Sequence, residues 1–339
     1  MADFDELIEG FSETPKVTTK TGKKLTNTAI VNEIISGIME VICNTNADAI
    51  IEATMPKVKE RIEKEIGVIP PRVEIKTPLQ SVIIEEATHE KFEEVLRWVY
   101  KDIPVYLTGK AGSGKNVICK QVAKALGLDF YFTNAVTQEY KLTGFIDANG
   151  NYHNTQFYDA FTKGGLFFLD EMDASVPETL VILNAAIANR YFDFPTGRVD
   201  AHPDFRVIAA GNTLGTGADI NYTGRYSLDR ASLDRFAMVR IDYSRRIEKA
   251  MTRDNNDLVE FAHSFRTVAE QAGVECLCSY RAMHMIDCME NEMDNLGDVM
   301  EAALVKGMDR DNLHILQRRM KDIAGMSGNK YAKAFIAMS

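Results

Sequence analysis

The stretch Val105-Tyr106-Leu107-Thr108-Gly109-Lys110-Ala111-Gly112-Ser113-Gly114-Lys115-Asn116 decides the fold of this chain. It consists of a short apolar strand, a glycine-rich loop and the start of a helix, and the loop has the G-x-x-x-x-G-K spacing of a phosphate-binding loop. Glycines lack the Cβ that blocks unusual backbone angles, so successive N–H groups can turn inward around an anion. The helix that follows adds the positive end of its dipole. We therefore predict that Gly109–Asn116 binds nucleotide phosphates and that Lys115 reaches the β- and γ-phosphates.

One residue of this loop departs from the pattern, which has Ser or Thr where this chain has Asn116. The missing hydroxyl normally contacts Mg²⁺. An Asn side chain can offer a carbonyl oxygen to the metal or to a metal-bound water, with a different reach and geometry. We expect nucleotide binding to be retained and hydrolysis to be slowed, with Asn116 as a metal-site residue.

Two further strand ends carry polar side chains. Leu166–Leu169 is a continuous apolar run that ends in Asp170 and Glu171, and Val207–Ala210 leads through Gly211 to Asn212. The carboxyl ends of parallel strands are where ligands bind in α/β folds. Asp170 is predicted to hold Mg²⁺ through its water shell, and Glu171 to polarise the attacking water. The amide of Asn212 can contact water and the γ-phosphate together.

The composition narrows the possible classes of protein. A chain of 339 residues has room for about two domains. The net charge of −10 argues against a whole-surface affinity for nucleic acid, although a local basic lumen stays possible. The five cysteines form no paired C-x-x-C set, and no apolar run approaches the roughly 18 residues of a membrane span. These features favour a protein of the reducing cytoplasm, without a zinc site or a membrane anchor.

The order of apolar segments predicts three parts. Residues 1–78 are expected to form a polar arm followed by helices over 26–66. Residues 79–243 alternate strands and helices, with a helix over Glu85–Lys101 and two hairpin insertions near Asn149-Gly150 and Pro195-Thr196-Gly197. Their apolar strands suit a parallel sheet that is buried on both faces. Residues 244–339 are expected to form a small helical domain. The five predicted strands are Val105–Thr108, Phe130–Thr133, Leu166–Leu169, Phe205–Ala209 and Ala237–Ile241.

From about residue 79 to 285 the chain resembles the AAA+ ATPases, in particular the MoxR-like and cobaltochelatase small-subunit (CobS-like) group. The phosphate loop, the Asp-Glu strand end and the Asn212 strand end carry the resemblance together with three further segments. These are Leu142-Thr143-Gly144-Phe145, Gly215-Thr216-Gly217 to Tyr222-Thr223-Gly224, and Leu233-Asp234-Arg235-Phe236. The resemblance implies an α/β phosphate-loop core with a parallel five-stranded sheet and helical insertions, followed by a small all-helical lid.

The same resemblance implies roles for four residues and an assembly. Asn212 matches the first sensor of the family, and Arg281, in Ser279-Tyr280-Arg281, matches a second sensor that contacts the γ-phosphate. Arg235 matches an arginine that acts on the nucleotide of a neighbouring subunit, and whether Arg230 shares this task is left open. The resemblance assigns Glu171 the same role as above, which is to polarise the attacking water. A trans-acting arginine requires a homo-oligomer, which in this family is usually a hexameric ring. ATP and Mg²⁺ are the implied ligands.

Several functions share this ATP-driven apparatus. The leading hypothesis is a ring-forming ATPase that remodels or loads a macromolecular client. We expect this client to be a protein, whose identity the sequence does not give. Metal insertion into a tetrapyrrole beside larger partner subunits is one alternative. A nucleic-acid motor or nucleoprotein-assembly factor is another, disfavoured by the acidic net charge. A slow-hydrolysing, nucleotide-gated scaffold is the alternative that Asn116 suggests.

Overall fold

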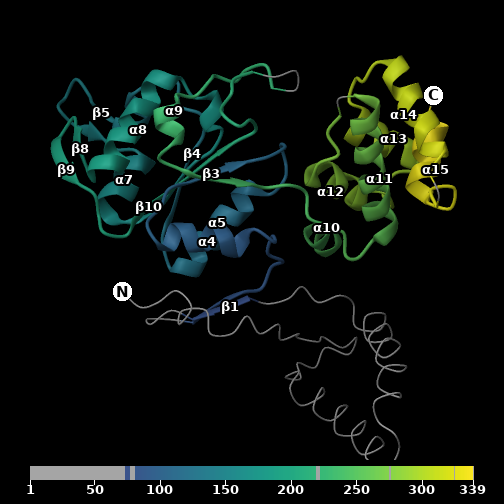
Figure 1. The fold of residues 1–339 in the computed structure, drawn as a ribbon, viewed down its shortest axis with the longest axis horizontal. Coiled ribbons are helices and arrows are strands. Elements are labelled where there is room, and N and C mark those ends of the chain that lie inside the picture. The colour runs from purple at the N-terminus through teal and green to yellow at the C-terminus, as the bar shows by residue number, and fades with distance from the viewer. Residues whose placement is uncertain (1–72, 77–80, 219–221, 275, 324, 339) are drawn as a thin grey trace, which may run out of the picture.

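The computed structural model describes residues 73–338, apart from 77–80, 219–221, 275 and 324. The predicted N-terminal arm and the helices predicted over 26–66 lie outside the described residues. Figure 1 shows an α/β part and a helical part that lie side by side. Within the described residues, no helix is long and apolar enough to cross a membrane.

A parallel sheet of five strands forms the centre of the α/β part, as predicted. The strand order is β11-β3-β10-β7-β4, and each neighbouring pair is parallel. The phosphate-loop strand, β3, therefore lies between two other strands, and β10 lies between β3 and β7, the strand that Asp170 follows. The strands are β3 (Val105–Thr108), β4 (Phe130–Thr133), β7 (Gly165–Leu169), β10 (Phe205–Gly211) and β11 (Ala237–Arg240).

Alternate residues of these strands pack into two different hydrophobic layers. Val105 and Leu107 of β3 pack with the helices α4 (Phe92–Tyr100) and α5 (Lys115–Leu126), whereas Tyr106 packs with the layer on the opposite face. That second layer includes α7 (Gln156–Lys163) and α8 (Pro177–Asn189). Because both faces are covered, the three inner strands β3, β7 and β10 are mostly apolar at successive positions and not only at alternate ones. This burial holds the carboxyl ends of the strands in fixed relative positions.

Short elements surround this core. Antiparallel pairs join β1 (Val73–Lys76) to β2 (Ser81–Ile84), β5 (Phe145–Ile146) to β6 (Tyr152–His153), and β8 (Tyr191–Phe194) to β9 (Gly197–Asp200). The last two pairs are the two predicted hairpins. The short helices are α6 (Tyr140–Thr143), a 3₁₀ turn (Met172–Ala174) and α9 (Arg230–Leu233).

The chain after Tyr243 is helical, with a hydrophobic core of its own. Phe261, Phe265 and Phe335 are fully buried in that core. The sequence predicts amphipathic stretches at Leu258–Gln271, Tyr280–Met293 and Leu313–Ile323, and these correspond to α11, α12 and α14. It predicts no separate elements at α10, α13, the π-helical turn and α15. The helices are α10 (Arg245–Met251), α11 (Asn256–Ala272), α12 (Tyr280–Met289), α13 (Leu296–Met300), the π-helical turn (Glu301–Val305), α14 (Arg310–Lys321) and α15 (Lys330–Ala337).

One predicted helix is wrong at its start. The helix expected over Glu85–Lys101 begins only at Phe92, and residues 85–89 are irregular. Tertiary contacts hold this segment out of the helix. The ring Nε2 of His89 lies 2.9 Å from the Asp242 carbonyl oxygen, and the Ala87 carbonyl accepts from the Gln121 side chain. The segment thus passes over the N-terminal part of α5, next to the phosphate loop.

Candidate nucleotide-binding site

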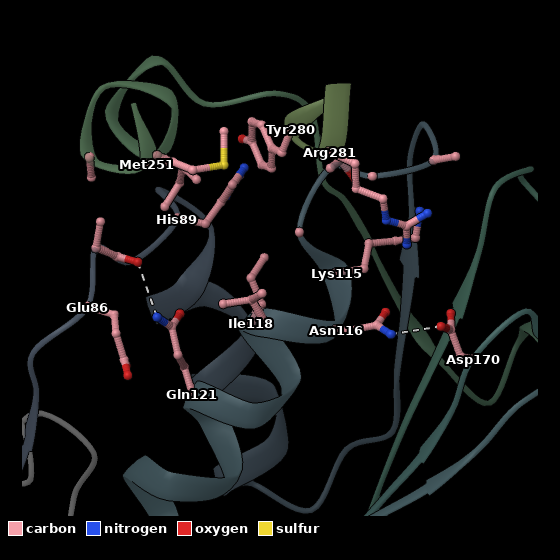
Figure 2. A pocket seen from close by; sticks show the side chains of 18 of the residues that line it. Glu86, His89, Lys115, Asn116, Ile118, Gln121, Asp170, Met251, Tyr280 and Arg281 are labelled. Carbon is pink, nitrogen blue, oxygen red and sulfur yellow. Dashed lines mark hydrogen bonds between the residues drawn. The ribbon is translucent and has the colours of Figure 1, made fainter. Parts of the chain in front are cut away.

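A cavity of about 600 Å³ lies along the phosphate loop and the N-terminal half of α5. Gly112 and Gly114 are among its lining residues. Figure 2 shows Lys115, Asp170 and Arg281 toward one end of the cavity and His89, Gln121 and Met251 toward the other. The cavity is large enough for a nucleotide-sized ligand. Its walls come from the sheet edge, from α5 and from the helical part.

The phosphate loop has the backbone that its glycines predict. Gly109, Gly112 and Gly114 have φ values of 152°, 71° and 89°, which side chains with a Cβ rarely adopt. Gly114 precedes α5, and the first turn of this helix contains no acidic side chain. The Ser113 hydroxyl oxygen is buried and has no hydrogen-bond partner among the described residues. A helix N-terminus and a free buried hydroxyl fit a phosphate group.

Lys115 is buried in the centre of the site, with 7% of its surface exposed. Its Nζ atom donates to the carbonyl oxygens of Gly109 (2.7 Å) and Lys110 (3.2 Å) and to Oδ1 of Asn212 (2.9 Å). Burial lowers the pKa of Lys115 to about 8, since desolvation outweighs the opposing attraction of Asp170 and Asp173. The structure thus joins the loop lysine to the side chain predicted as the first sensor.

Asp170 and Asn116 also meet directly. The Asn116 Nδ2 donates to Oδ2 of Asp170 at 2.9 Å (Figure 2), and the Glu171 backbone N–H donates to Oδ1 of Asp170 at 3.0 Å. Within the described residues, no group of three or more His, Cys, Asp or Glu side chains has a metal-binding arrangement. A carboxylate with one neighbouring amide oxygen nevertheless fits Mg²⁺, which takes few protein ligands when phosphates supply the others. Asp170 and Asn116 are thus the residues that would hold the ion.

Glu171 lies beside this pair in an unusual backbone conformation, with a φ of 53°. Non-glycine residues adopt the left-handed region at an energetic cost and concentrate at functional sites when they do. Its carboxylate is half-exposed and accepts from Arg225. Glu171 therefore stands at the strand end where the sequence predicted it.

The structure separates the predicted arginines. Arg281 lies at the start of α12, lines the cavity, and is near enough to Lys115 to contribute to lowering its pKa. Arg235 follows α9, is exposed, and contacts the Ala231 carbonyl. Neither Arg235 nor Arg230 is among the residues that line the described cavity. The chain thus brings Arg281 to its own phosphate loop and leaves both other arginines outside it.

The sequence did not indicate several residues that organise the site. Asp173 is fully buried and forms an ion pair with Arg225, and Tyr222 contacts the Ala111 N–H through its hydroxyl at 3.0 Å. The Tyr243 hydroxyl donates to the Ala111 carbonyl at 3.0 Å, and the Tyr280 N–H donates to the Gly112 carbonyl. The only signal for Asp173 was its place in the acidic run Asp170-Glu171-Met172-Asp173. The three tyrosines and Arg225 are remote in sequence from the phosphate loop, so spacing does not reveal these contacts.

The geometry places a phosphate loop and a cavity at the carboxyl edge of a parallel sheet, in an α/β fold. Residues 104–236, about two fifths of the chain, match the family described as AAA domain (dynein-related subfamily). An uncharacterized protein of Staphylococcus saprophyticus is 27% identical over 203 residues, which cover 53% of this chain and 74% of the relative. One of Staphylococcus epidermidis is 29% identical over 203 residues, with the same coverage of 53% and 74%.

Solved structures give weaker similarities. NtrX from Brucella abortus has a TM-score of 0.41 and 17% identity, and the match covers 74% of this chain and 64% of NtrX. The structure of NtrX in complex with ATP has a TM-score of 0.38 and 18% identity, with 79% of this chain and 59% of that chain covered. This chain therefore spans less than two thirds of NtrX.

Proposed function

We propose that this protein is a ring-forming AAA+ ATPase of the MoxR-like or cobaltochelatase small-subunit kind, which couples binding and hydrolysis of Mg-ATP to remodelling or loading of a macromolecular client. One observation carries the proposal: Asp170, Glu171 and Asn212 follow two strand ends and line one cavity of nucleotide size together with Lys115, the first residue of α5 after the phosphate loop. The family match over residues 104–236 supports it.

Each residue has a defined task in this proposal. The loop N–H groups and Lys115 bind the phosphates, and Asn212 holds the lysine through its Oδ1. A bound Mg²⁺, held by Asp170 and Asn116, would neutralise charge on the phosphate oxygens. Glu171 accepts a hydrogen bond from the attacking water and aligns it for attack. Arg281 supplies positive charge from the helical part of the chain.

The test is steady-state phosphate release by the full chain with ATP and Mg²⁺. Lys115→Ala should abolish nucleotide binding or weaken it sharply. Glu171→Gln keeps the size of the side chain and removes the charge that polarises water, so it should bind ATP with wild-type affinity and stop turnover. Wild-type protein that binds no nucleotide in the presence of Mg²⁺ would contradict the proposal, as would a Glu171→Gln variant with normal turnover.

A second candidate function is favoured by the hydrogen bond between Asn116 and Asp170. Because the amide occupies one oxygen of the carboxylate, hydrolysis could be slow enough for nucleotide binding alone to set assembly. Asn116→Thr removes this hydrogen bond and restores a hydroxyl. We expect this variant to reach half-maximal phosphate release at a severalfold lower Mg²⁺ concentration, as about 1 kcal/mol from one hydrogen bond implies. An unchanged Mg²⁺ dependence would show that Asn116 does not limit the metal step.

A further inference from the structure

Arg225 joins the carboxylates of two residues that the proposed function treats separately. Its Nη1 donates to Oδ1 of Asp173 at 3.0 Å, and its Nη2 donates to Oε1 of Glu171 at 3.3 Å. Only 11% of the Arg225 side chain is exposed, against 40% of Glu171 and none of Asp173. The guanidinium therefore links a buried carboxylate to one at the cavity.

The Asp173 end of this link is rigidly held. Its Oδ2 accepts from three donors, each at 2.9 Å: the N–H groups of Asn212 and Thr213 and the Thr213 hydroxyl. Its carbonyl oxygen accepts from the Tyr226 N–H at 2.7 Å. Asp173 is thus bound to the strand end that presents Asn212. Buried, fully hydrogen-bonded carboxylates keep one geometry.

The Glu171 end depends on Arg225 for its orientation. Within the described part of the chain, Arg225 is the partner of the Glu171 carboxylate. A half-exposed glutamate has several rotamers, so without a partner it would sample positions away from the attacking water. The contact occupies Oε1 and leaves Oε2 available.

We propose that Arg225 is a positioning residue for hydrolysis: it fixes the Glu171 carboxylate so that Oε2 faces the attacking water, and through Asp173 it sets that position relative to Asn212. This role rests on the proposed ATPase function. The phosphate loop binds nucleotide through Lys115 and its own N–H groups, which Arg225 does not contact. Loss of Arg225 should therefore lower the turnover number and leave nucleotide affinity nearly unchanged.

Two substitutions test this role. Arg225→Met keeps the length of the side chain and removes both hydrogen bonds. Arg225→Lys keeps the charge, but a single ammonium lacks the planar fork that places two nitrogens on two carboxylates. Arg97→Met is the control, because Arg97 forms an exposed ion pair with Glu93 on α4, on the surface of the molecule. The measurements are the kcat and KM of phosphate release, ATP affinity by equilibrium titration, and Tm.

We expect kcat to fall about ten- to hundredfold in Arg225→Met, as for a misplaced catalytic group. In Arg225→Lys, kcat should also fall below the wild-type value. Both variants should bind ATP with an affinity within about threefold of wild type. Arg97→Met should match the wild type. If Arg225→Met fails to fold, Arg225→Lys carries the test, since its ammonium still neutralises the buried Asp173.

Three results would overturn the role of Arg225 alone: an unchanged or raised kcat in Arg225→Met, a wild-type kcat in a folded Arg225→Lys, or a loss of ATP affinity with kcat unchanged. The last result would place Arg225 on the phosphates. Wild-type protein that binds ATP and releases no phosphate would overturn the proposed ATPase and this role with it.

Discussion

The Lys115 ammonium is held in a buried site by hydrogen bonds to uncharged acceptors. Its ammonium is desolvated, and two backbone carbonyls and Asn212 replace the lost water as acceptors. Phosphate oxygens are better partners than these neutral acceptors, because they bring opposite charge. A lysine with a lowered pKa therefore gains its full charge when the anion arrives.

This arrangement predicts a pH dependence of nucleotide binding. With a pKa of about 8, Lys115 is charged in the empty site below pH 8 and neutral above it. Binding above pH 8 must include uptake of a proton, so the dissociation constant of ATP should rise, approaching about tenfold per pH unit. Fluorescence titration with labelled ATP between pH 7 and 9.5 measures this.

Lys115→Arg is the matched variant, because an arginine stays charged throughout this range. It should bind ATP more weakly at pH 7 and show a much flatter pH profile. An equally steep rise in Lys115→Arg would mean that another group causes the dependence.

At the same scale, the sequence located residues with local chemistry and missed those that act through tertiary contacts. Asp170, Glu171 and Asn212 follow apolar strands directly, so the strand pattern placed them at the sheet edge. Arg225 lies 52 residues after Asp173, in a segment without periodicity, and only the fold brings the two together. Local sequence patterns contain no information about such a pair.

Among the elements, the contact between the phosphate loop and α12 connects the two parts of the chain. The Tyr280 N–H donates to the Gly112 carbonyl, and the Tyr280 hydroxyl accepts from the Ser244 N–H at 2.6 Å. A Cβ built on Gly112 would lie 2.7 Å from the Ser279 Cβ. The missing side chain thus serves two purposes: the positive φ of the loop and the close approach of the helix.

Gly112→Ala should push the phosphate loop and α12 apart. The substitution forces a left-handed alanine, which costs about 1–2 kcal/mol, and adds a clash with Ser279. Gly150→Ala is the control, since Gly150 has a similar φ of 83° at a hairpin tip and no atom lies within 4 Å of the added Cβ. Both should lower the free energy of unfolding in urea, but only Gly112→Ala should weaken ATP binding. Equal ATP affinities in the two variants would rule out a functional role for the close contact.

The elements also show which sequence signals are reliable. The strands of the sheet were predicted because they are short, mostly apolar runs, and the three inner strands β3, β7 and β10 are also buried on both faces. The helix expected from Glu85 was too long, because contacts of Ala87 and His89 with α5 and Asp242 override local helical preference. The short α13 and α15 were missed because segments of five and eight residues give little periodicity to detect.

For the whole molecule, the position of Arg235 raises the question of assembly. One chain brings Lys115, Asp170, Glu171, Asn212 and Arg281 to one site, while Arg235 is exposed outside the cavity. An arginine that stabilises transition-state charge has to reach the phosphates. If Arg235 has the role that its sequence motif implies, it serves the site of a second copy, and a ring is the closed arrangement that gives every site such a neighbour.

Mixing two inactive variants tests this arrangement. Arg235→Ala keeps its own phosphate loop and should bind ATP without turnover, whereas Lys115→Ala lacks nucleotide binding but still carries Arg235. In co-expressed mixed rings, a site of the first variant can receive the arginine of the second. Random equimolar mixing would give about a quarter of the sites both groups, and therefore about a quarter of wild-type phosphate release.

Mixing Lys115→Ala with Glu171→Gln is the control: both residues belong to the same site of one chain, so no mixture restores it and no activity should return. Normal turnover by Arg235→Ala alone would show that Arg235 does not act at a neighbouring site, as would a failure of both mixtures to recover activity. Recovery in the first mixture only would show that hydrolysis belongs to the assembly and not to the single chain.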